Sequence, residues 1–372
     1  MPLLLWCACP SEPPPLTPEQ LKAEAEGHYL AAQAAYMKAD FAKAHEEFDA
    51  VRKLAPGDVR LPAAEGELFL SEGKLAEAVE KYRAALKIDA KRATTYSRLG
   101  YILVSKGERE EGVQLLNKAL ELNPKDFNAW SILADLSYEK KDRDAAVKHA
   151  LAAAEAAPEK MQGGYVKKAV DWSIEANETD KAIEILQGAT ARGVKSEDLF
   201  EQLGSLLVQK QKFEEAIEAY SKAAAEAPKD PTLWEIVGEL HFKQGRPKEA
   251  ETAYKKSLAI QDRGVVHVAI ARMCRANKMA DCVAKELDKA LRTASGEEPR
   301  EMLDLADLLE SENRKKDSLL ILKQLSGEPS ELKNLELQLK VAKLGAELKD
   351  KEAVAAACER VLKLGKPGTR CP

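Results

Sequence analysis

Four of the six cysteines fall into two local pairs, and they have the most definite chemistry in this chain. Cys274 is close in sequence to Cys282, and Cys358 is close to Cys371. Two disulfides would place the protein in an oxidising compartment, whereas free thiols would leave its compartment open. We expect no metal site, because no Cys-x-x-Cys motif occurs and no histidine lies near either pair at zinc-ligand spacing. The two pairs are therefore candidate disulfides, with buried or incidental thiols as the alternative.

The first nine residues form a short apolar stretch, MPLLLWCAC, and a proline-rich linker follows it through Pro18. The stretch resembles the end of a bacterial lipoprotein signal, with Ala8 before the cleavage point and Cys9 as the residue that receives the lipid. It departs from that pattern at Trp6, where an aliphatic residue is expected, and it lacks the positive region that begins an export signal. We predict a signal-like segment and linker over residues 1–18, with a cytoplasmic N-terminus and incidental cysteines as the alternative.

No motif in the sequence points to catalysis. The five histidines are scattered, and the motifs His-Glu-x-x-His, Gly-x-Ser-x-Gly and Gly-x-x-x-x-Gly-Lys-Ser/Thr are absent. Acidic pairs are many, but they lie on charged helical faces, where solvation explains them better than acid–base chemistry. We therefore expect a protein that is not an enzyme and needs no cofactor.

The composition is that of a folded helical protein. Of its 372 residues, 45% are hydrophobic, 32% are charged and only 5% are aromatic. The 57 Lys and Arg residues nearly balance the 62 Asp and Glu residues, so no basic excess is available to neutralise nucleic-acid phosphates. No apolar run approaches the roughly 20 residues that a membrane-spanning helix needs. The composition argues against a transmembrane protein and against a nucleic-acid partner.

A repeat with a period of about 34 residues runs through the chain. Most copies have a small residue with a bulky one four positions later, and most add a second small residue and a proline. One step, between Ala146 and Ala182, is two residues longer than the others. The first small residues are Ala44, Ala78, Gly112, Ala146, Ala182, Ala216 and Ala250, and clear bulky partners are Phe48, Tyr82, Leu116 and Tyr220.

A second periodic segment precedes each small residue. It carries pairs such as Leu99-Gly100 and Val237-Gly238, whose second member lies twelve residues before the small residue of the next segment. Apolar residues at i, i+3, i+4 and i+7 in both segments indicate two amphipathic helices that approach closely at the small residues. Residues that accept the left-handed conformation separate the two segments, which predicts a tight turn. They are Gly73, Gly107, Asn177, Gly245 and Asn313.

This pattern resembles the tetratricopeptide repeat family over nearly the whole chain after the linker. Residues 230–262 carry the family's markers at Trp234, Gly238, Ala250 and Tyr254. The resemblance implies an all-α, right-handed superhelical solenoid of about ten antiparallel helix hairpins. Neighbouring hairpins must stack in such a fold, because a lone hairpin cannot bury its apolar face.

The regularity of the repeat suggests three groups of hairpins. We expect N-terminal repeats over 19–162, middle repeats over 163–262 and degenerate repeats over 263–372. The longer step falls at the sequence KMQGGYV around Gly163-Gly164. We interpret it as a joint between two sub-solenoids or as a slightly longer loop without motion.

In the family, residues of the first helices line the concave groove, and the resemblance maps this surface onto the chain. Its tyrosines supply rigid contact area with a polar tip, and its later part is acidic. We expect it to hold an extended or helical polypeptide whose Lys or Arg faces the carboxylates; the alternative is that these residues are solvated helix faces. The candidate groove residues are Tyr29, Gln33, Tyr36, Glu67, Tyr101, Asp135, Tyr138, Asp171, Glu201, Ser205, Glu235 and Glu239.

The resemblance implies a non-enzymatic scaffold whose partners are one or more proteins or peptides. We expect it in the periplasm or tethered to the outer membrane, as part of pilus, secretion or outer-membrane assembly. The membrane would then be contacted only through a lipid on Cys9. The alternative is a soluble cytoplasmic adaptor for regulatory or signalling proteins. The sequence leaves the partner's identity and the oligomeric state open.

Overall fold

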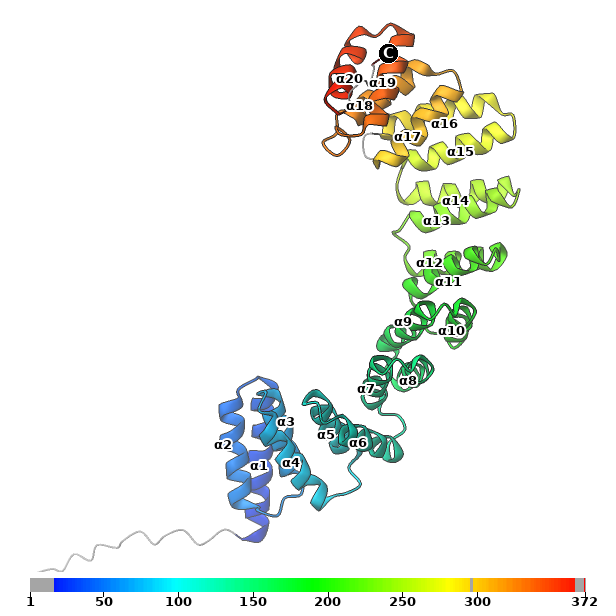
Figure 1. Cartoon of the computed structure of the whole chain (residues 1–372). Coiled ribbons are helices and arrows are strands. Elements are labelled where there is room, and N and C mark those ends of the chain that lie inside the picture. Colours follow the sequence, from blue (N-terminus) through cyan, green and yellow to red (C-terminus); the bar gives the residue numbers. More distant parts are fainter. Residues whose placement is uncertain (1–16, 295–296, 365–370, 372) are drawn as a thin grey trace, which may run out of the picture. The chain divides into compact units, whose positions relative to one another are not determined.

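The computed structural model describes residues 17–294, 297–364 and 371, and over these residues the chain forms 20 helices and no strand (Figure 1). Each helix is followed after a short turn or loop by the next one, so successive helices run in antiparallel pairs. The prediction of an all-α fold with about ten helix hairpins is confirmed. The chain divides into two compact units, residues 1–185 and 186–372, and the three repeat groups inferred from the sequence stay a prediction.

The first unit contains four packed helix pairs, from α1–α2 to α7–α8, followed by α9, which packs on α8. α10 crosses the division between the two units. The bounds are α1 Pro18–Met37, α2 Phe41–Leu54, α3 Leu61–Ser71, α4 Leu75–Ile88, α5 Ala93–Ser105, α6 Arg109–Leu122, α7 Phe127–Glu139, α8 Arg143–Ala156, α9 Glu159–Glu175 and α10 Thr179–Ala191.

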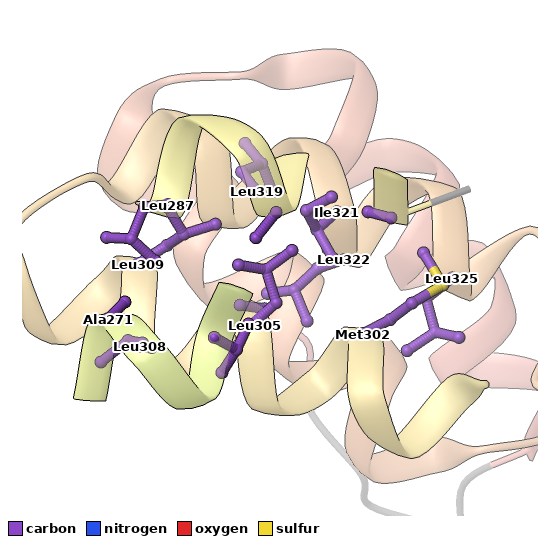
Figure 2. Packing of buried hydrophobic residues seen from close by; sticks show 14 of the residues in the cluster. Ala271, Leu287, Met302, Leu305, Leu308, Leu309, Leu319, Ile321, Leu322 and Leu325 are labelled. Carbon is purple, nitrogen blue, oxygen red and sulfur yellow. The ribbon is translucent and has the colours of Figure 1, made fainter. Parts of the chain in front are cut away.

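The second unit contains five packed pairs, from α11–α12 to α19–α20. Its last helices share one continuous apolar core, in which leucines from α16, α17 and α18 point toward one another (Figure 2). The bounds are α11 Glu197–Gln209, α12 Phe213–Glu226, α13 Thr232–Lys243, α14 Pro247–Ile260, α15 Gly264–Ala276, α16 Ala280–Thr293, α17 Pro299–Ser311, α18 Lys315–Ser326, α19 Leu335–Leu348 and α20 Lys351–Leu364.

The turn inside each of the ten pairs contains one residue with positive φ. The five predicted turn residues, three glycines and two asparagines, all adopt this conformation, with φ between 60° and 89°. The other five turns use residues with a Cβ atom, which costs roughly 1–2 kcal/mol per residue in the left-handed region. The same turn therefore forms wherever the flanking helices require it. These residues are Ala39, Lys141, Gln211, Lys278 and Lys349.

The longer step of the repeat is a helical extension. Gly163 and Gly164 lie inside α9, which has 17 residues, whereas α7 has 13. Only Ala157 and Pro158 separate α8 from α9, so α9 gains its extra turn from two inserted residues and from a shorter loop. The longer loop inferred at this point is therefore wrong, because α9 continues through the glycine pair. The joint between two sub-solenoids stays a prediction.

The small residues of the repeat let a tyrosine of the second helix lie against the backbone of the first helix. In three pairs a first-helix glycine faces a second-helix tyrosine, and a Cβ atom on that glycine would lie 2.5–2.8 Å from the ring. In the fourth pair the matching residues are Ala134 and Ala150, both buried. The glycine–tyrosine pairs are Gly66–Tyr82, Gly204–Tyr220 and Gly238–Tyr254.

We predict that Gly238→Ala lowers the free energy of unfolding by about 2 kcal/mol, because the new methyl group overpacks against Tyr254. In a Tyr254→Ala background the same change recreates the alanine pair of the fourth repeat and should cost little. A double-mutant cycle in urea measures this coupling. If Gly238→Ala lowered the free energy of unfolding equally in both backgrounds, the Tyr254 ring would not be what requires a glycine at position 238.

Candidate binding groove

Three successive first helices of the first unit, α1, α3 and α5, line one cavity of about 450 Å³. Four of the predicted groove residues meet there: Tyr29, Gln33, Tyr36 and Glu67. The cavity also contains the second-helix rings of Phe48 and Tyr82 and the guanidinium groups of Arg60 and Arg92. We call it the tyrosine cavity.

Arg60 is fixed at one wall of the tyrosine cavity. Its guanidinium carbon lies 4.2 Å from the centre of the Tyr29 ring. Its Nη2 atom donates to carboxylate oxygens of Asp58 and Glu26, each at 2.7 Å. These hydrogen bonds from Arg60 hold the pKa of both carboxyl groups below the ordinary range. The positive charge of Arg60 is thus already balanced by two carboxylates of the same unit.

The other charged groups of the cavity also have partners within the chain. Glu67 accepts a hydrogen bond of 3.0 Å from Nε of Arg98 on the next first helix. Arg92 forms a longer ion pair, with 3.9 Å between its Nε atom and Asp89. Each charged side chain that lines the cavity in the described part of the chain therefore has a counter-ion.

Tyr82 adds a buried hydroxyl group to the lining of the cavity. The residue is only 1% exposed, and among the described residues its hydroxyl has no hydrogen-bond partner. Burial raises the pKa of Tyr82 well above its ordinary value, and the neighbouring Glu67 carboxylate adds to this effect. The hydroxyl therefore stays protonated at physiological pH. The sequence analysis identified Tyr82 only as a bulky packing residue. Its sequence separation from Gly66 is the same as that of Tyr254 from Gly238, and this shared spacing could have indicated that Tyr82 lies beneath the groove.

The remaining tyrosines of the predicted groove lie outside the tyrosine cavity. Tyr101 is exposed on α5. Tyr138 stacks on Trp172 with 4.7 Å between ring centres, and its hydroxyl donates to Glu175 at 2.6 Å. Arg143 lies 3.9 Å from the centre of the same ring. Tyr138 is therefore held by neighbours on α8 and α9.

The acidic groove residues are distributed over both units, and most of them pair with cations of the chain. Asp135 binds Nζ of Lys168 at 2.6 Å. Glu235 is partly buried, binds Nη1 of Arg263 at 2.9 Å and accepts from the Ser257 hydroxyl at 3.1 Å. Much of the negative charge that was expected to face a basic partner is therefore compensated internally. A carboxylate oxygen of Asp171 lies 3.8 Å from Nζ of Lys167, and one of Glu239 lies 3.8 Å from Nζ of Lys243. Two further groove residues, Glu201 and Ser205, are exposed on α11.

Family models identify the repeat. A model described as TPR repeat matches residues 66–107, and one described as tetratricopeptide repeat matches residues 97–160 and 201–264. The chain contains tetratricopeptide repeats. The matched segments include the second half of α3 and all of α5, together with Glu67, Tyr101, Asp135 and Glu235 of the predicted groove.

Three solved structures that are similar to this chain are distant from it in sequence. YrrB, a tetratricopeptide-repeat protein with an unusual peptide-binding site, is 18% identical, with 54% of this chain and 99% of that chain covered and a TM-score of 0.34. MamA is 16% identical, with 64% of this chain and 93% of that chain covered and a TM-score of 0.27. Yeast Tom70 is 10% identical, with 93% of both chains covered and a TM-score of 0.39. No curated protein matches the sequence.

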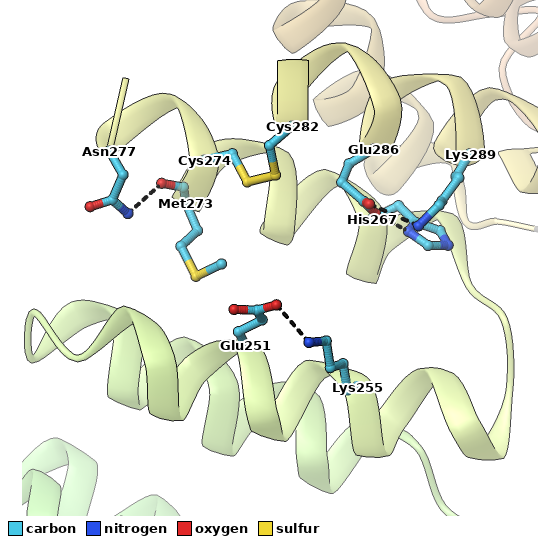
Figure 3. Close-up of a disulfide and its surroundings, with 9 residues drawn as sticks. All are labelled: Glu251, Lys255, His267, Met273, Cys274, Asn277, Cys282, Glu286 and Lys289. Atoms are coloured by element: carbon cyan, nitrogen blue, oxygen red, sulfur yellow. Dashed lines mark hydrogen bonds and ion pairs between the residues drawn. A yellow bond between two sulfur atoms is a disulfide. The ribbon is translucent and has the colours of Figure 1, made fainter. Parts of the chain in front are cut away.

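The tetratricopeptide-repeat structure joins both candidate cysteine pairs as disulfides. Cys274 at the end of α15 is bonded to Cys282 at the start of α16, with 5.9 Å between Cα atoms (Figure 3). Cys358 on α20 is bonded to Cys371, with 5.5 Å between Cα atoms. Cys9, the lipidation candidate, lies outside the described residues.

Two further features of the described residues bear on function. No group of His, Cys, Asp and Glu side chains among them is arranged to hold a metal ion. None of the helices in the described part of the chain is long and apolar enough to cross a membrane.

A buried histidine lies on α15, the helix that also carries Cys274 of the first disulfide. His267 on α15 lies between two carboxylates, with Nδ1 2.6 Å from Glu286 and Nε2 2.8 Å from Asp262. Lys289 binds the other oxygen of Glu286 at 2.8 Å (Figure 3). No sequence pattern pointed to this network, because the five histidines are scattered along the sequence. The network ties α15 to α16 within one repeat.

Arg263, at the start of α15, is the centre of a second charged network. Its guanidinium lies 2.9 Å from Glu235 on α13, 3.3 Å from Glu301 on α17 and 3.9 Å from Glu297 just before α17. Glu297 also accepts a hydrogen bond from the backbone N–H of Gly264. Burial and a hydrogen bond with Glu301 raise the pKa of Glu297 to about 7. One cation thus holds together three first-helix regions of the second unit.

Proposed function

We propose that this chain is a scaffold that binds polypeptide partners on the first-helix surface of its tetratricopeptide repeats, without catalysis of its own. Repeats of this kind expose extended surfaces built from one helix of each pair. The observation that carries the proposal is the tyrosine cavity, because three successive first helices contribute aromatic and polar side chains to it. A surface of rigid rings with polar tips is typical of the centres of protein interfaces.

The proposal is tested with a photo-crosslinking amino acid at Gln33, an exposed residue of the tyrosine cavity, in the full-length chain. The matched control carries the same amino acid at Glu46, an exposed residue of the neighbouring second helix α2. We expect one recurring polypeptide segment, identified by mass spectrometry, to crosslink at Gln33 and not at Glu46. Equal crosslinking at both positions, or none at Gln33, would contradict a polypeptide-binding surface here.

We further propose that the scaffold acts in the cell envelope, as a component of an assembly or secretion machine, with a lipid on Cys9 as its membrane tether. Two disulfides favour an oxidising compartment and support this setting. In cells that express the chain, alkylation without reductant should leave the four paired cysteines unmodified, and Cys9→Ser should release the protein from the membrane fraction. Four reactive thiols and a soluble wild-type protein would instead favour the cytoplasmic adaptor.

A further inference from the structure

The outer face of α1 is apolar and exposed. Five residues at alternating spacings of four and three share this face, which points away from the buried residues of the helix. The largest of them are Leu30, which is 56% exposed, and Met37, which is 86% exposed. Such spacings place residues on one narrow stripe of a helix, as in the seam of a coiled coil. We call these residues the α1 stripe: Ala23, Gly27, Leu30, Ala34 and Met37.

The same face is covered in the repeats that follow. Leu61 and Leu68 of α3 lie one repeat period after Gly27 and Ala34, and both are buried. They share an apolar cluster with Phe48 of α2, in the preceding repeat. A first helix therefore uses this face to pack on the repeat before it, and no described residue takes that place on α1. The equivalent residues of the next two repeats are also buried: Thr95, Ile102, Ala129 and Leu136.

Gly27 leaves room on the α1 stripe for a close neighbour. A glycine inside a helix makes the helix less stable than an alanine would. Gly66 and Gly238, which also lie inside first helices, each have a tyrosine ring of their own repeat against the position of the missing Cβ atom. Around Gly27 no atom of the described residues lies within 4 Å of that position. The packing of the described chain therefore does not require this glycine, whereas the close approach of another helix would.

The α1 stripe is complementary to itself when two copies of α1 lie antiparallel. In a register centred on position 32, Leu30 faces Ala34 of the other copy and Met37 faces Gly27, so each large side chain meets a small residue. A parallel pair in register would instead set Leu30 against Leu30 and Gly27 against Gly27. The antiparallel pair has two-fold symmetry, in which both copies use the same patch.

The charged residues beside the α1 stripe select the same arrangement. Glu24 and Lys38 lie along one edge of the stripe, are exposed, and form no ion pair with another described residue. In the antiparallel pair Glu24 of each copy faces Lys38 of the other, which gives two ion pairs. In the parallel pair Glu19 would instead lie beside Glu24 of the other copy, and such contacts between like charges are unfavourable.

We propose that two copies of this chain associate through the α1 stripe as an antiparallel helix pair, in which Leu30 packs on Ala34 and Glu24 pairs with Lys38 of the other copy. The occupant is a second copy because both the sizes and the charges of the side chains match under two-fold symmetry. One helix pair makes an interface smaller than the roughly 1,200–2,000 Å² of stable complexes, so the dimer should be weak and reversible. This inference goes beyond the proposed function, since it requires no other partner.

The test is analytical ultracentrifugation of the full-length chain from about 10 µM to about 500 µM, a range suited to a weak contact of this size. We expect a monomer at the low end and a dimer at the high end. Glu24→Lys and Lys38→Glu each turn both ion pairs into repulsions, so each should weaken the dimer about tenfold. The double variant restores both pairs with the charges exchanged and should dimerise like the wild type.

The apolar contact is tested with Leu30→Glu, which should abolish the dimer over the same concentrations because it places a carboxylate against Ala34 of the other copy. The matched control is Leu320→Glu, which changes a leucine of similar exposure on α18 and should leave the dimer intact. Both leucines are exposed, so neither variant should lower the melting temperature. A loss of dimer that came from unfolding would appear in that measurement.

A wild-type chain that stays monomeric at about 500 µM would overturn the inference, whether residues 1–16 or a different protein covers the α1 stripe instead. A dimer that persists in Leu30→Glu, or one that Leu320→Glu weakens equally, would overturn it too. So would a double charge variant that dimerises no better than the single ones. The scaffold proposal is judged separately, because a crosslink from Gln33 to a second copy has twice the mass of the chain and is distinct from a crosslink to a partner segment.

Discussion

Replacing Arg263 with methionine should lower the free energy of unfolding of the second unit by about 3 kcal/mol. Removal of one partner from a buried ion pair usually costs about 3–5 kcal/mol, and the 18% exposure of the Arg263 side chain places the effect at the lower end. Methionine keeps much of the volume of the arginine side chain, so the loss of stability reports mainly the removal of the positive charge. Three carboxylates, those of Glu235, Glu297 and Glu301, would then share one partly buried site without a cation.

The effect of Arg263→Met should depend on pH with a definite sign. The pKa of Glu297 in the folded protein is about 7, above the ordinary 4.5, so the folded state holds a proton that the unfolded state releases between these values. Stability from this group is present at acid pH and is lost as pH rises toward 7. Loss of the Arg263 charge raises this pKa further. The gap between variant and wild type should therefore be smaller at pH 5 than at pH 8.

Native-state hydrogen exchange of the amides in α13, α15 and α17 is the measurement, at both pH values. Arg272→Met is the matched control, because Arg272 also lies on α15 but is 44% exposed and pairs with Asp304 at 3.5 Å. An exposed pair of this kind contributes about 1 kcal/mol or less. Equal losses in the two variants would show that the Arg263 network does not link these helices.

The sequence predicted the features of the fold that depend on the period of the repeat. The spacing predicted that the two helices of a repeat approach closely at their small residues, and in the structure Gly238 of α13 lies against Tyr254 of α14. The sequence also predicted the glycines that adopt positive φ in the turns. It did not predict Lys141 and Gln211, because tertiary packing imposes their positive φ on residues that have no preference for it.

The candidate site was predicted less completely, for two physical reasons. The groove residues were assigned from first-helix positions alone, whereas Tyr82 reaches the tyrosine cavity from a second helix past the space left by Gly66. Ion pairs between neighbouring repeats, such as Glu67 with Arg98, depend on the reach of flexible side chains. In a chain in which 32% of residues are charged, spacing alone does not select these pairs from the many available.

Truncation of Leu322 to alanine should destabilise the second unit by about 3 kcal/mol, within the 2–5 kcal/mol usual for a buried leucine. Leu322 lies on α18, is fully buried and packs in the leucine core shown in Figure 2. Leu320→Ala is the matched control, because Leu320 lies two residues away on the same helix and is 62% exposed. Its cost should stay within about 0.5 kcal/mol.

The extent of the damage should follow the packing rather than the repeat count. In a solenoid each repeat contacts only its neighbours, so a defect spreads as far as the core is continuous. The core that contains Leu322 runs without interruption from Ala250 to Ala357, whereas Leu116 of the first unit belongs to a small cluster around α6 and α7. Hydrogen exchange should therefore show lost protection from α15 through α20 in Leu322→Ala, but loss confined to the neighbouring helices in Leu116→Ala. If Leu322→Ala affected only α17 and α18, the degenerate repeats would unfold as independently as the regular ones. The continuous core would then not be the feature that stabilises repeats in which the family's marker residues are missing.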